Sequence, residues 1–352
     1  MSVAESNMRR DVSATAQPAG LISLFAWIGA GWLALALWCW TRWILSDNFR
    51  PVDPGSDPLP AWQSLALIGL QVFGLIVALY CVWHYALKPR IETGRFTTEG
   101  LVCLALPTVW FQDLMFGYAQ TWMTYNAHLW NMGSWAKQIP GWMARHPENM
   151  LEPFVTFYGY IFWMFCCMLL ICAVMRAIRR RWPNASQSLV LAGGLLFTFA
   201  LDCVVEQSAI RLGWYAIPGA WRAVSLFAGT PHQLPIHEVF FGALQTFLFA
   251  LVLFYRDEQG YSFVENGVER LKARGARRTF TRFLALVGAL HIFFFVSFSM
   301  PSMWGALHSD EWVDGMPSYF TAMCPEYKVQ RERCGGRGIP AYRPEHNWLP
   351  EK

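Results

Sequence analysis

Residues 186–211 read SQSLVLAGGLLFTFALDCVVEQSAIR. A membrane-spanning helix needs about 20 predominantly apolar residues, and this stretch is long enough to provide one. The same stretch carries Asp202 and Glu206 inside its apolar run. A charged side chain at membrane depth costs about 2.5–3.5 kcal/mol, so such residues usually face a buried cavity that uses them. The stretch therefore predicts a helix that crosses a membrane and contributes to a functional site.

The whole chain has the composition of a membrane protein. Of its 352 residues, 55% are hydrophobic and 15% are charged, whereas a soluble domain carries about 25% charged residues. The predicted fold is all-α and polytopic, with a polar head over 1–19, a seven-helix membrane domain over 20–300 and a tail over 301–352. The seven predicted spans are roughly 20–45, 62–86, 100–123, 151–177, 186–211, 233–256 and 279–300.

The distribution of lysine and arginine predicts the orientation of the chain. Loops on the cytoplasmic side of a membrane are enriched in these residues. The three loops on one side of the predicted membrane hold only Arg50, Lys137, Arg145, Arg211 and Arg222. We expect the N-terminus inside and the C-terminus outside, because the head and the alternate loops hold most of the remaining basic residues: Arg9, Arg10, Lys88, Arg90, Arg95, Arg176, Arg179, Arg180, Arg181, Arg256, Arg270, Lys272, Arg274, Arg277, Arg278 and Arg282.

Two cysteines lie in the predicted exterior tail. Cys324 and Cys334 are ten residues apart, and an oxidising compartment would allow a disulfide between them. Two separate thiols in a flexible tail are the alternative. The other cysteines fall in the predicted spans and lack zinc-ligand spacing, so no metal site is predicted.

Asp202 and Glu206 are four residues apart, which places both side chains on one helical face, about 6 Å apart along the axis. Two carboxylates this close in a low-dielectric environment are not expected to be ionised together. The pair is therefore suited to hold a proton beside a negative charge. An internal brace, in which one acid pairs with Arg211 or a neighbouring helix, is the alternative.

Other ionisable residues fall in the remaining spans. His237 and Glu238 open the sixth span, at the same predicted depth as Asp202 and Glu206. Asp113 lies near the middle of the third span, where an acid is not expected to face lipid. The alternatives are a helix-dipole role for Glu238, which lies in a first helical turn, and a structural role for His291 in the seventh span.

The loop 125–142, YNAHLWNMGSWAKQIPGW, is predicted to lie outside and is rich in aromatic and amide residues. It would form either a lid over the cavity or an interfacial aromatic belt. The predicted substrate-binding residues come from this loop, from the outer end of the fifth span and from the seventh span. They are Asn126, His128, Asn131, Trp135, Arg211, Trp214, Tyr215 and His291.

Several function classes do not fit the sequence. The seventh span lacks a lysine for a retinal Schiff base, and His237 and His291 lie at different predicted depths, unlike a bis-histidine haem pair. Phosphate-loop and dinucleotide-binding motifs are absent from the sequence, and no D-x-x-x-D diphosphate motif falls within a predicted span. We therefore predict chemistry that needs no cofactor, with a lipophilic small molecule and membrane lipids as partners. No nucleic-acid partner and no particular oligomeric state are predicted.

Four segments resemble the AveC-like spirocyclase family of bacterial membrane proteins, over residues from about 100 to about 300. The resemblance implies a bacterial cytoplasmic-membrane location and closure of a spiroketal from a dihydroxy-ketone, with loss of water. A fainter likeness is to membrane carotenoid and terpene cyclases and hydratases, which also place carboxylates in a helical bundle. The segments are NAHLWNMGSW (126–135), ENMLEPFVTFYGY (148–160), D-x-x-x-E (202–206) followed by GWY (213–215), and PHQLPIHEVFFG (231–242).

The residues and the resemblance together predict a cofactor-independent cyclase or dehydratase acting on a polyketide, terpenoid or steroid-like substrate. Glu206 is the predicted acid and Asp202 its carboxylate partner. Glu238 and His237 are expected on the opposite wall, and Asp113 on the floor. The alternative is a proton-coupled transporter or lipophile-binding protein, which the apparent lack of internal repeats and broken helices disfavours.

Overall fold

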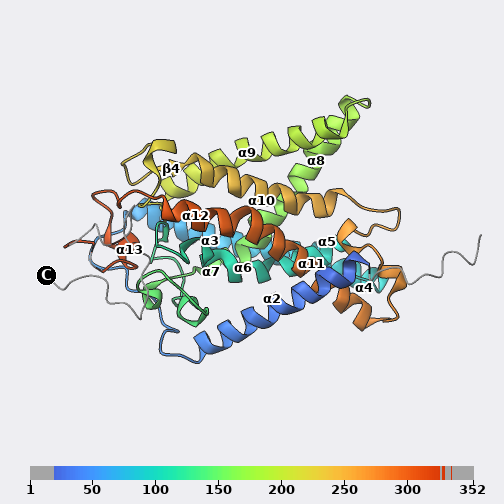
Figure 1. Cartoon of the computed structure of the whole chain (residues 1–352), viewed down its shortest axis with the longest axis horizontal. Helices are drawn as coiled ribbons and strands as arrows, with labels where there is room; N and C mark the ends of the chain where they lie inside the picture. Colours follow the sequence, from blue (N-terminus) through green and yellow to red (C-terminus); the bar gives the residue numbers. More distant parts are fainter. Residues whose placement is uncertain (1–19, 326, 330–333, 335–352) are drawn as a thin grey trace, which may run out of the picture.

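The computed structural model describes residues 20–325, 327–329 and 334. Seven helices in this part of the chain are long and apolar enough to cross a membrane, which confirms the predicted number. The helices form an elongated bundle (Figure 1). The predicted head, 1–19, lies outside the described residues. The spans are Leu21–Ile44, Ala61–Thr93, Thr98–Gly117, Phe154–Arg181, Gln187–Leu212, Ile236–Phe254 and Ala276–Leu307.

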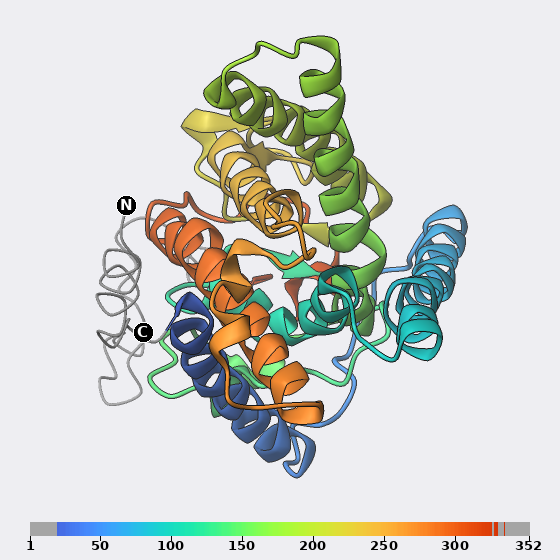
Figure 2. The ribbon, with the colours of Figure 1, turned by 90° about the vertical axis from the view of Figure 1, so that its right-hand side faces the viewer.

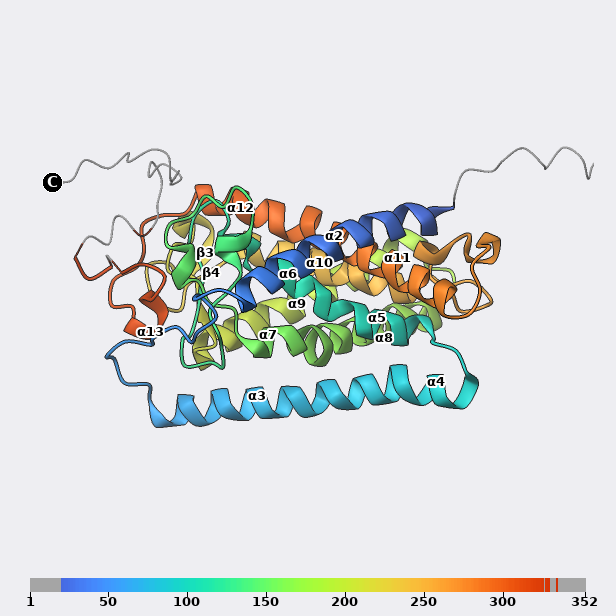
Figure 3. The ribbon, with the colours of Figure 1, turned by 90° about the horizontal axis from the view of Figure 1, so that it is seen from below.

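Three spans are uninterrupted α-helices: α2 (Leu21–Ile44), α9 (Gln187–Leu212) and α10 (Ile236–Phe254). Three others are pairs of α-helices joined through a π-helical segment. Figure 3 shows the first pair, α3 and α4, as a long rod along one edge of the bundle. The pairs are α3 (Ala61–Cys81) with α4 (Lys88–Thr93), α7 (Phe154–Gly159) with α8 (Cys166–Arg181), and α11 (Ala276–Phe294) with α12 (Met300–Leu307).

The seventh span extends beyond its predicted end at residue 300. Its last helix, α12, continues to Leu307. Pro301 lies in the first turn of α12, where a missing backbone N–H costs little, and the π-helical segment Phe295–Ser299 precedes it. The membrane helix therefore includes the beginning of what the sequence predicted as tail.

The third span is broken, which contradicts the expectation of uninterrupted helices. It consists of α5 (Thr98–Ala105) and α6 (Trp110–Asp113), with 3₁₀ turns at Leu106–Val109 and Leu114–Gly117. Pro107 lies in the first of these turns and lacks the N–H that a continuous α-helix would need. The helix also ends at Gly117, not near the predicted residue 123, so Asp113 lies close to its end.

A pair of glycines brings α2 and α11 into close contact. A Cβ atom added to Gly29 would lie 1.9 Å from the carbonyl oxygen of Leu284, and one added to Gly288 would lie 2.0 Å from that of Phe25. Small residues let membrane helices approach closely where van der Waals packing drives their association. Figure 2 shows the two helices crossing on one side of the bundle. This crossing fixes the first span against the seventh.

The long loops gather at one end of the bundle (Figures 1 and 3). There β1 (Thr124–Tyr125) pairs antiparallel with β2 (Tyr215–Ala216), and β3 (Ser225–Leu226) with β4 (Leu234–Pro235). The chain after α12, including α13 (Ser318–Thr321), packs onto these loops. The backbone N–H of Ala127 donates to the carbonyl oxygen of Tyr319 at 2.9 Å. A disulfide joins Cys324 to Cys334, which settles the alternative left open by the sequence.

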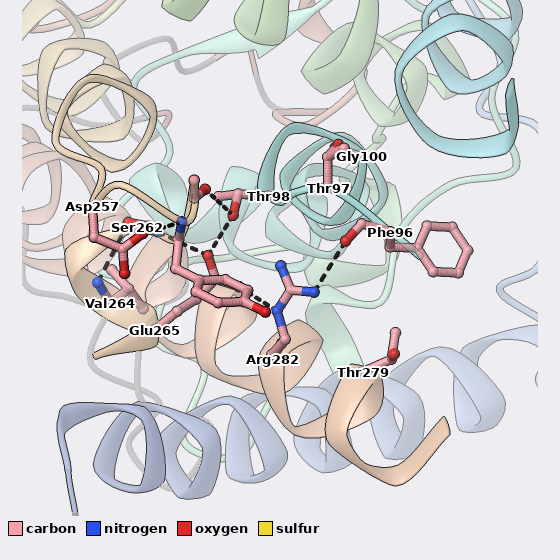
Figure 4. Close-up of polar contacts among 12 residues, drawn as sticks. Phe96, Thr97, Thr98, Gly100, Asp257, Ser262, Val264, Glu265, Thr279 and Arg282 are labelled. Atoms are coloured by element: carbon pink, nitrogen blue, oxygen red, sulfur yellow. Dashed lines mark hydrogen bonds and ion pairs between the residues drawn. The ribbon is translucent and has the colours of Figure 1, made fainter. Parts of the chain in front are cut away.

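A buried ion pair fastens the opposite end of the bundle (Figure 4). The Nε atom of Arg282 on α11 lies 2.6 Å from Oε1 of Glu265, which belongs to the loop after α10. Thr98 at the start of α5 donates to the other oxygen of Glu265 at 2.6 Å, and Arg282 also donates to the carbonyl oxygen of Phe96. Removing one member of such a pair typically costs about 3–5 kcal/mol. The network thus connects the starts of the third and seventh spans with the loop that follows the sixth.

Candidate functional site

A cavity of about 360 Å³ is lined by residues of the second to seventh spans, most of them from the fourth, fifth and sixth. Four of the acids singled out in the sequence line it: Asp113, Asp202, Glu206 and Glu238. The volume falls within the range of sites for small organic ligands, about 300–1,000 Å³. The rest of the lining is mainly apolar or aromatic and includes Leu70, Met123, Phe162, Trp163, Met164, Val205, Ala209, Leu212, Trp214, Ile217, Phe294 and Phe298.

Helix α9 presents Asp202 and Glu206 to the cavity from one face, as their four-residue spacing predicts. The hydroxyl of Tyr215 donates to Oε2 of Glu206. No described residue hydrogen-bonds the Asp202 carboxyl group. A Cβ atom on Gly242 of α10 would lie 2.9 Å from Oδ2 of Asp202, so glycine leaves room for this acid. Glu206 is held in place, whereas Asp202 is open to the cavity.

Glu238 reaches the cavity from the first turn of α10. It is 4% exposed and accepts a hydrogen bond of 3.0 Å from the hydroxyl of Ser302 on α12. Its position in the first turn also suits a negative charge near the positive end of the helix dipole. The extension of the seventh span to Leu307 therefore supplies the partner of this acid.

Asp113 is held by two tyrosines. Oδ2 accepts from the hydroxyl of Tyr125 and Oδ1 from that of Tyr160, both at 2.6 Å. Tyr160 begins the π-helical segment Tyr160–Phe165, and π-helical turns of this kind are frequent at functional sites. The β1–β2 register places Tyr125 opposite Tyr215, so neighbouring tyrosines hold different acids of the cavity.

The sequence reasoning missed Glu152. This residue is 1% exposed, and the indole N–H of Trp110 lies beside its carboxyl group. Its carboxyl group lies within hydrogen-bonding reach of Asp113. Burial, and then the negative charge of Asp113, raises the pKa of Glu152 well above its usual value. Two sequence signals were available: Glu152 occurs in the family-like segment ENMLEPFVTFYGY, and it is an acid within the predicted span 151–177.

The hydrogen-bonding partners Tyr125, Tyr160 and Ser302 were also not singled out. Hydroxyl groups on a membrane helix or loop carry no charge cost that would attract attention in a sequence. Tyr125 could have been suggested by its place at the start of the aromatic loop 125–142. Tyr160 and Ser302 depend on π-helical geometry and on helix length, neither of which the apolar pattern reveals.

The two predicted histidines do not line the cavity. His237 packs against Trp122, Trp221 and Phe241, beside the cavity residue Glu238. His291 is fully buried and lies parallel to Trp32, with ring centroids 5.2 Å apart. Gln112 donates to its Nδ1 atom at 2.7 Å. The contacts of His291 are those of a structural histidine, and a structural role was the alternative given for this residue.

Of the other predicted substrate-binding residues, some line the cavity and the rest make structural contacts outside it. Trp214 and Tyr215 line the cavity. Asn126 donates to the carbonyl oxygen of Gly213 at 2.8 Å, and Asn131 accepts from the backbone N–H of Val52 at 3.0 Å.

The others also lie outside the lining. Trp135 is fully buried and donates to the carbonyl oxygen of Phe111. His128 is exposed beside Tyr319, and Arg211 is exposed above the ring of Phe227. The loop 125–142 thus packs as an ordered cap, with Tyr125 its contribution to the cavity wall.

The arrangement places four carboxyl groups in a mainly apolar lining. Some of these acids are held by hydroxyl donors, and Asp202 has none among the described residues. Within the part of the chain that the structure describes, no group of three His, Cys, Asp or Glu side chains is arranged to hold a metal ion. The site can therefore give and accept protons beside a bound apolar molecule.

Comparison with known proteins identifies the family. The comparisons with curated proteins and with solved structures gave no significant match. The sequence profile of the family described as Spirocyclase AveC-like matches residues 93–320, which is more than half of the chain and includes all four cavity acids. Family membership points to a membrane protein with a cyclase-type enzymatic role. The chain belongs to the AveC-like spirocyclase family.

Proposed function

We propose that the protein is a cofactor-independent cyclase or dehydratase that acts on a lipophilic polyketide, terpenoid or steroid-like substrate. One observation carries the proposal: carboxyl groups from the third, fifth and sixth spans line a single cavity. Ring closure with loss of water needs a proton donor, a proton acceptor and a folded substrate shielded from water. The cavity offers carboxyl groups for the first two roles and a mainly apolar lining for the substrate.

Glu206 is the proposed acid, and Asp202 the proposed carboxylate that accepts a proton or stabilises positive charge. The hydroxyl of Tyr215 orients Glu206, while Asp202 is open to the substrate. Glu238 provides the opposite wall, and His237, its neighbour in the chain, packs against Trp122 outside the lining. Trp214 contributes an aromatic surface to the substrate site.

Closure of a spiroketal from a dihydroxy-ketone illustrates the chemistry. One substrate hydroxyl adds to the ketone carbon, and the carbonyl oxygen becomes the hydroxyl of a hemiketal. Glu206 protonates that hydroxyl, which leaves as water while positive charge develops on the remaining C–O unit. The second hydroxyl then attacks the same carbon and gives its proton to Asp202, which returns it to Glu206. The net change is two new C–O bonds and one released water, and the acids end as they began.

The proposed orientation places the cavity near the outer face of a bacterial cytoplasmic membrane. The long-loop end of the bundle holds few basic residues, whereas the segments 88–97, 176–186 and 255–278 at the opposite end are rich in them. Basic loops favour the cytoplasmic side. A lipophilic substrate dissolved in the bilayer would then reach the cavity without crossing the basic face.

The test is a ring-closure assay on the purified protein in lipid nanodiscs. The probe is an open-chain dihydroxy-ketone, and mass spectrometry follows the loss of one water. Glu206→Gln should lower the rate by at least about 100-fold, the lower range for a positioned acid, while the variant stays folded. Glu258→Gln, at an exposed loop position, is the matched control. Unchanged turnover by Glu206→Gln would remove this residue from the mechanism.

A proton-coupled transporter is the second candidate, because the third span is broken next to Asp113. Broken helices often line binding sites in transporters. Sealed vesicles with an imposed pH gradient distinguish the candidates. An enzyme would convert the probe without a gradient, whereas a transporter would move it across the membrane unchanged.

A further inference from the structure

Glu152 and Asp113 are neighbouring carboxyl groups in a site that provides no positive partner to either among the described residues. Glu152 is 1% exposed and Asp113 is 8% exposed. The groups that face Glu152 are Asp113 and Trp110 on α6, Tyr125 on β1 and Tyr160 on the π-helical segment. All of them are acidic or neutral. Two adjacent buried carboxylates would repel each other strongly, so the pair must share a proton.

The hydrogen bonds decide which acid carries that proton. Both oxygens of Asp113 already accept short hydrogen bonds from tyrosine hydroxyls. Hydrogen bonds of this length are typical of a charged acceptor. Glu152 has only the indole N–H of Trp110 beside it and no hydroxyl donor among the described residues, and a contact between two carboxyl groups is favourable only when one of them donates. The proton therefore belongs on Glu152, and the negative charge on Asp113.

We propose that Glu152 is a positioning residue that carries a proton, donates it in a hydrogen bond to Asp113 and thereby holds Asp113 as the anionic wall of the cavity. Asp113 lines the cavity and Glu152 lies behind it. Three O–H donors then fix one carboxylate, which faces the space where a substrate would develop positive charge. Such preorganised charge stabilises a cationic transition state without rearrangement during the reaction.

The protonation of Glu152 can be measured without any substrate. Infrared spectra of the purified protein at neutral pH should contain a carboxylic-acid carbonyl band that Glu152→Gln lacks. Glu148→Gln, in the same loop but exposed, should keep the band. If Glu152→Gln fails to fold, Asp113→Asn should shift the same band, because the hydrogen-bond partner of Glu152 changes. A carbonyl region that neither substitution alters would overturn the proposal.

The pH dependence of turnover tests the positioning role, which rests on the proposed function. Because the pKa of Glu152 is raised, its hydrogen bond is complete at low pH and is lost as pH rises through that raised value. The wild type should therefore lose kcat on the alkaline side, with KM little changed. Glu152→Gln keeps an N–H donor and cannot ionise, so it should retain kcat at higher pH.

The outcomes separate this inference from the proposed function. Identical alkaline limbs in wild type and Glu152→Gln would reject the positioning role, even if Glu206→Gln is inactive. Full activity of Glu206→Gln would reject the proposed mechanism, even if the infrared band behaves as expected. Glu152→Met removes the donor altogether and should lower kcat at every pH, which a donor role requires.

Discussion

At the scale of single residues, the site is a set of acids that differ in how firmly they are held. Asp113 has two tyrosine donors, Glu206 has one and Glu238 has a serine. Asp202 has none among the described residues. A firmly held carboxyl group can present a fixed charge or proton, whereas a free one can follow a substrate proton. The arrangement therefore suits a division of roles among chemically similar groups.

The hydroxyl of Tyr215 provides a test at this scale. Tyr215→Phe removes the hydrogen bond to Glu206 and keeps the ring in the cavity wall. Glu206 becomes a carboxylate as it gives up its proton, and a hydrogen bond to a charged group contributes about 1.5–3 kcal/mol, so kcat should fall about 10- to 100-fold. Tyr118→Phe is the control, because its hydroxyl donates to the carbonyl oxygen of Gly141 outside the cavity. Equal rates for both variants would show that Glu206 needs no such support.

The sequence predicted much of the site at this scale and missed its supporting groups. Acids inside apolar segments are conspicuous because their cost in a membrane is high, so Asp113, Asp202, Glu206 and Glu238 were identified directly. Their convergence on one cavity was expected and is found, while their catalytic roles stay predictions. Glu152 fell at the second residue of the predicted span 151–177 and was overlooked there, and the structure begins that helix only at Phe154.

At the scale of elements, interruptions of the helices position the site. The broken third span ends just after Asp113, and a π-helical segment turns Tyr160 toward the same acid. The apolar pattern predicted seven spans because hydrophobic length is readable from composition. It did not predict these interruptions, because a 3₁₀ or π-helical turn changes hydrogen bonding and leaves hydrophobicity unchanged.

The glycine contact between α2 and α11 provides a test at the element scale. Gly29→Ala should lower the thermal stability of the detergent-solubilised protein, because the new methyl group would overlap the backbone of α11. Overpacking of this kind costs about 1–3 kcal/mol. Gly31→Ala, on the same helix with no atom within 4 Å of the added Cβ, should leave stability unchanged. A similar loss in both variants would point to helix propensity or solubilisation, not to this contact.

At the scale of the whole molecule, the two ends of the bundle differ in construction. One end is built from ordered loops and a disulfide-linked tail segment, and the other from basic loops and a buried ion pair. The sequence predicted the charge difference but treated the tail as separate from the helical domain. Hydrogen bonds from the tail to the loops depend on backbone positions, which no residue pattern reveals.

The proposed orientation is tested by labelling introduced cysteines in intact cells. Asp47→Cys lies in the exposed loop after α2, and Glu258→Cys in the exposed loop after α10. With the N-terminus inside, a membrane-impermeant maleimide should label residue 47 before lysis and residue 258 only after lysis. The reverse pattern would invert the chain and place the cavity near the cytoplasmic face.

The most direct test of the central claim is to neutralise each of the four cavity acids in turn. Asp113→Asn, Asp202→Asn, Glu206→Gln and Glu238→Gln preserve shape and remove the ability to carry a carboxyl proton or charge. Ring closure of a dihydroxy-ketone is then measured for each variant in lipid nanodiscs, beside Glu258→Gln. The account predicts folded proteins whose turnover is lost in the cavity variants and kept in the control. Wild-type turnover in all four cavity variants would contradict it.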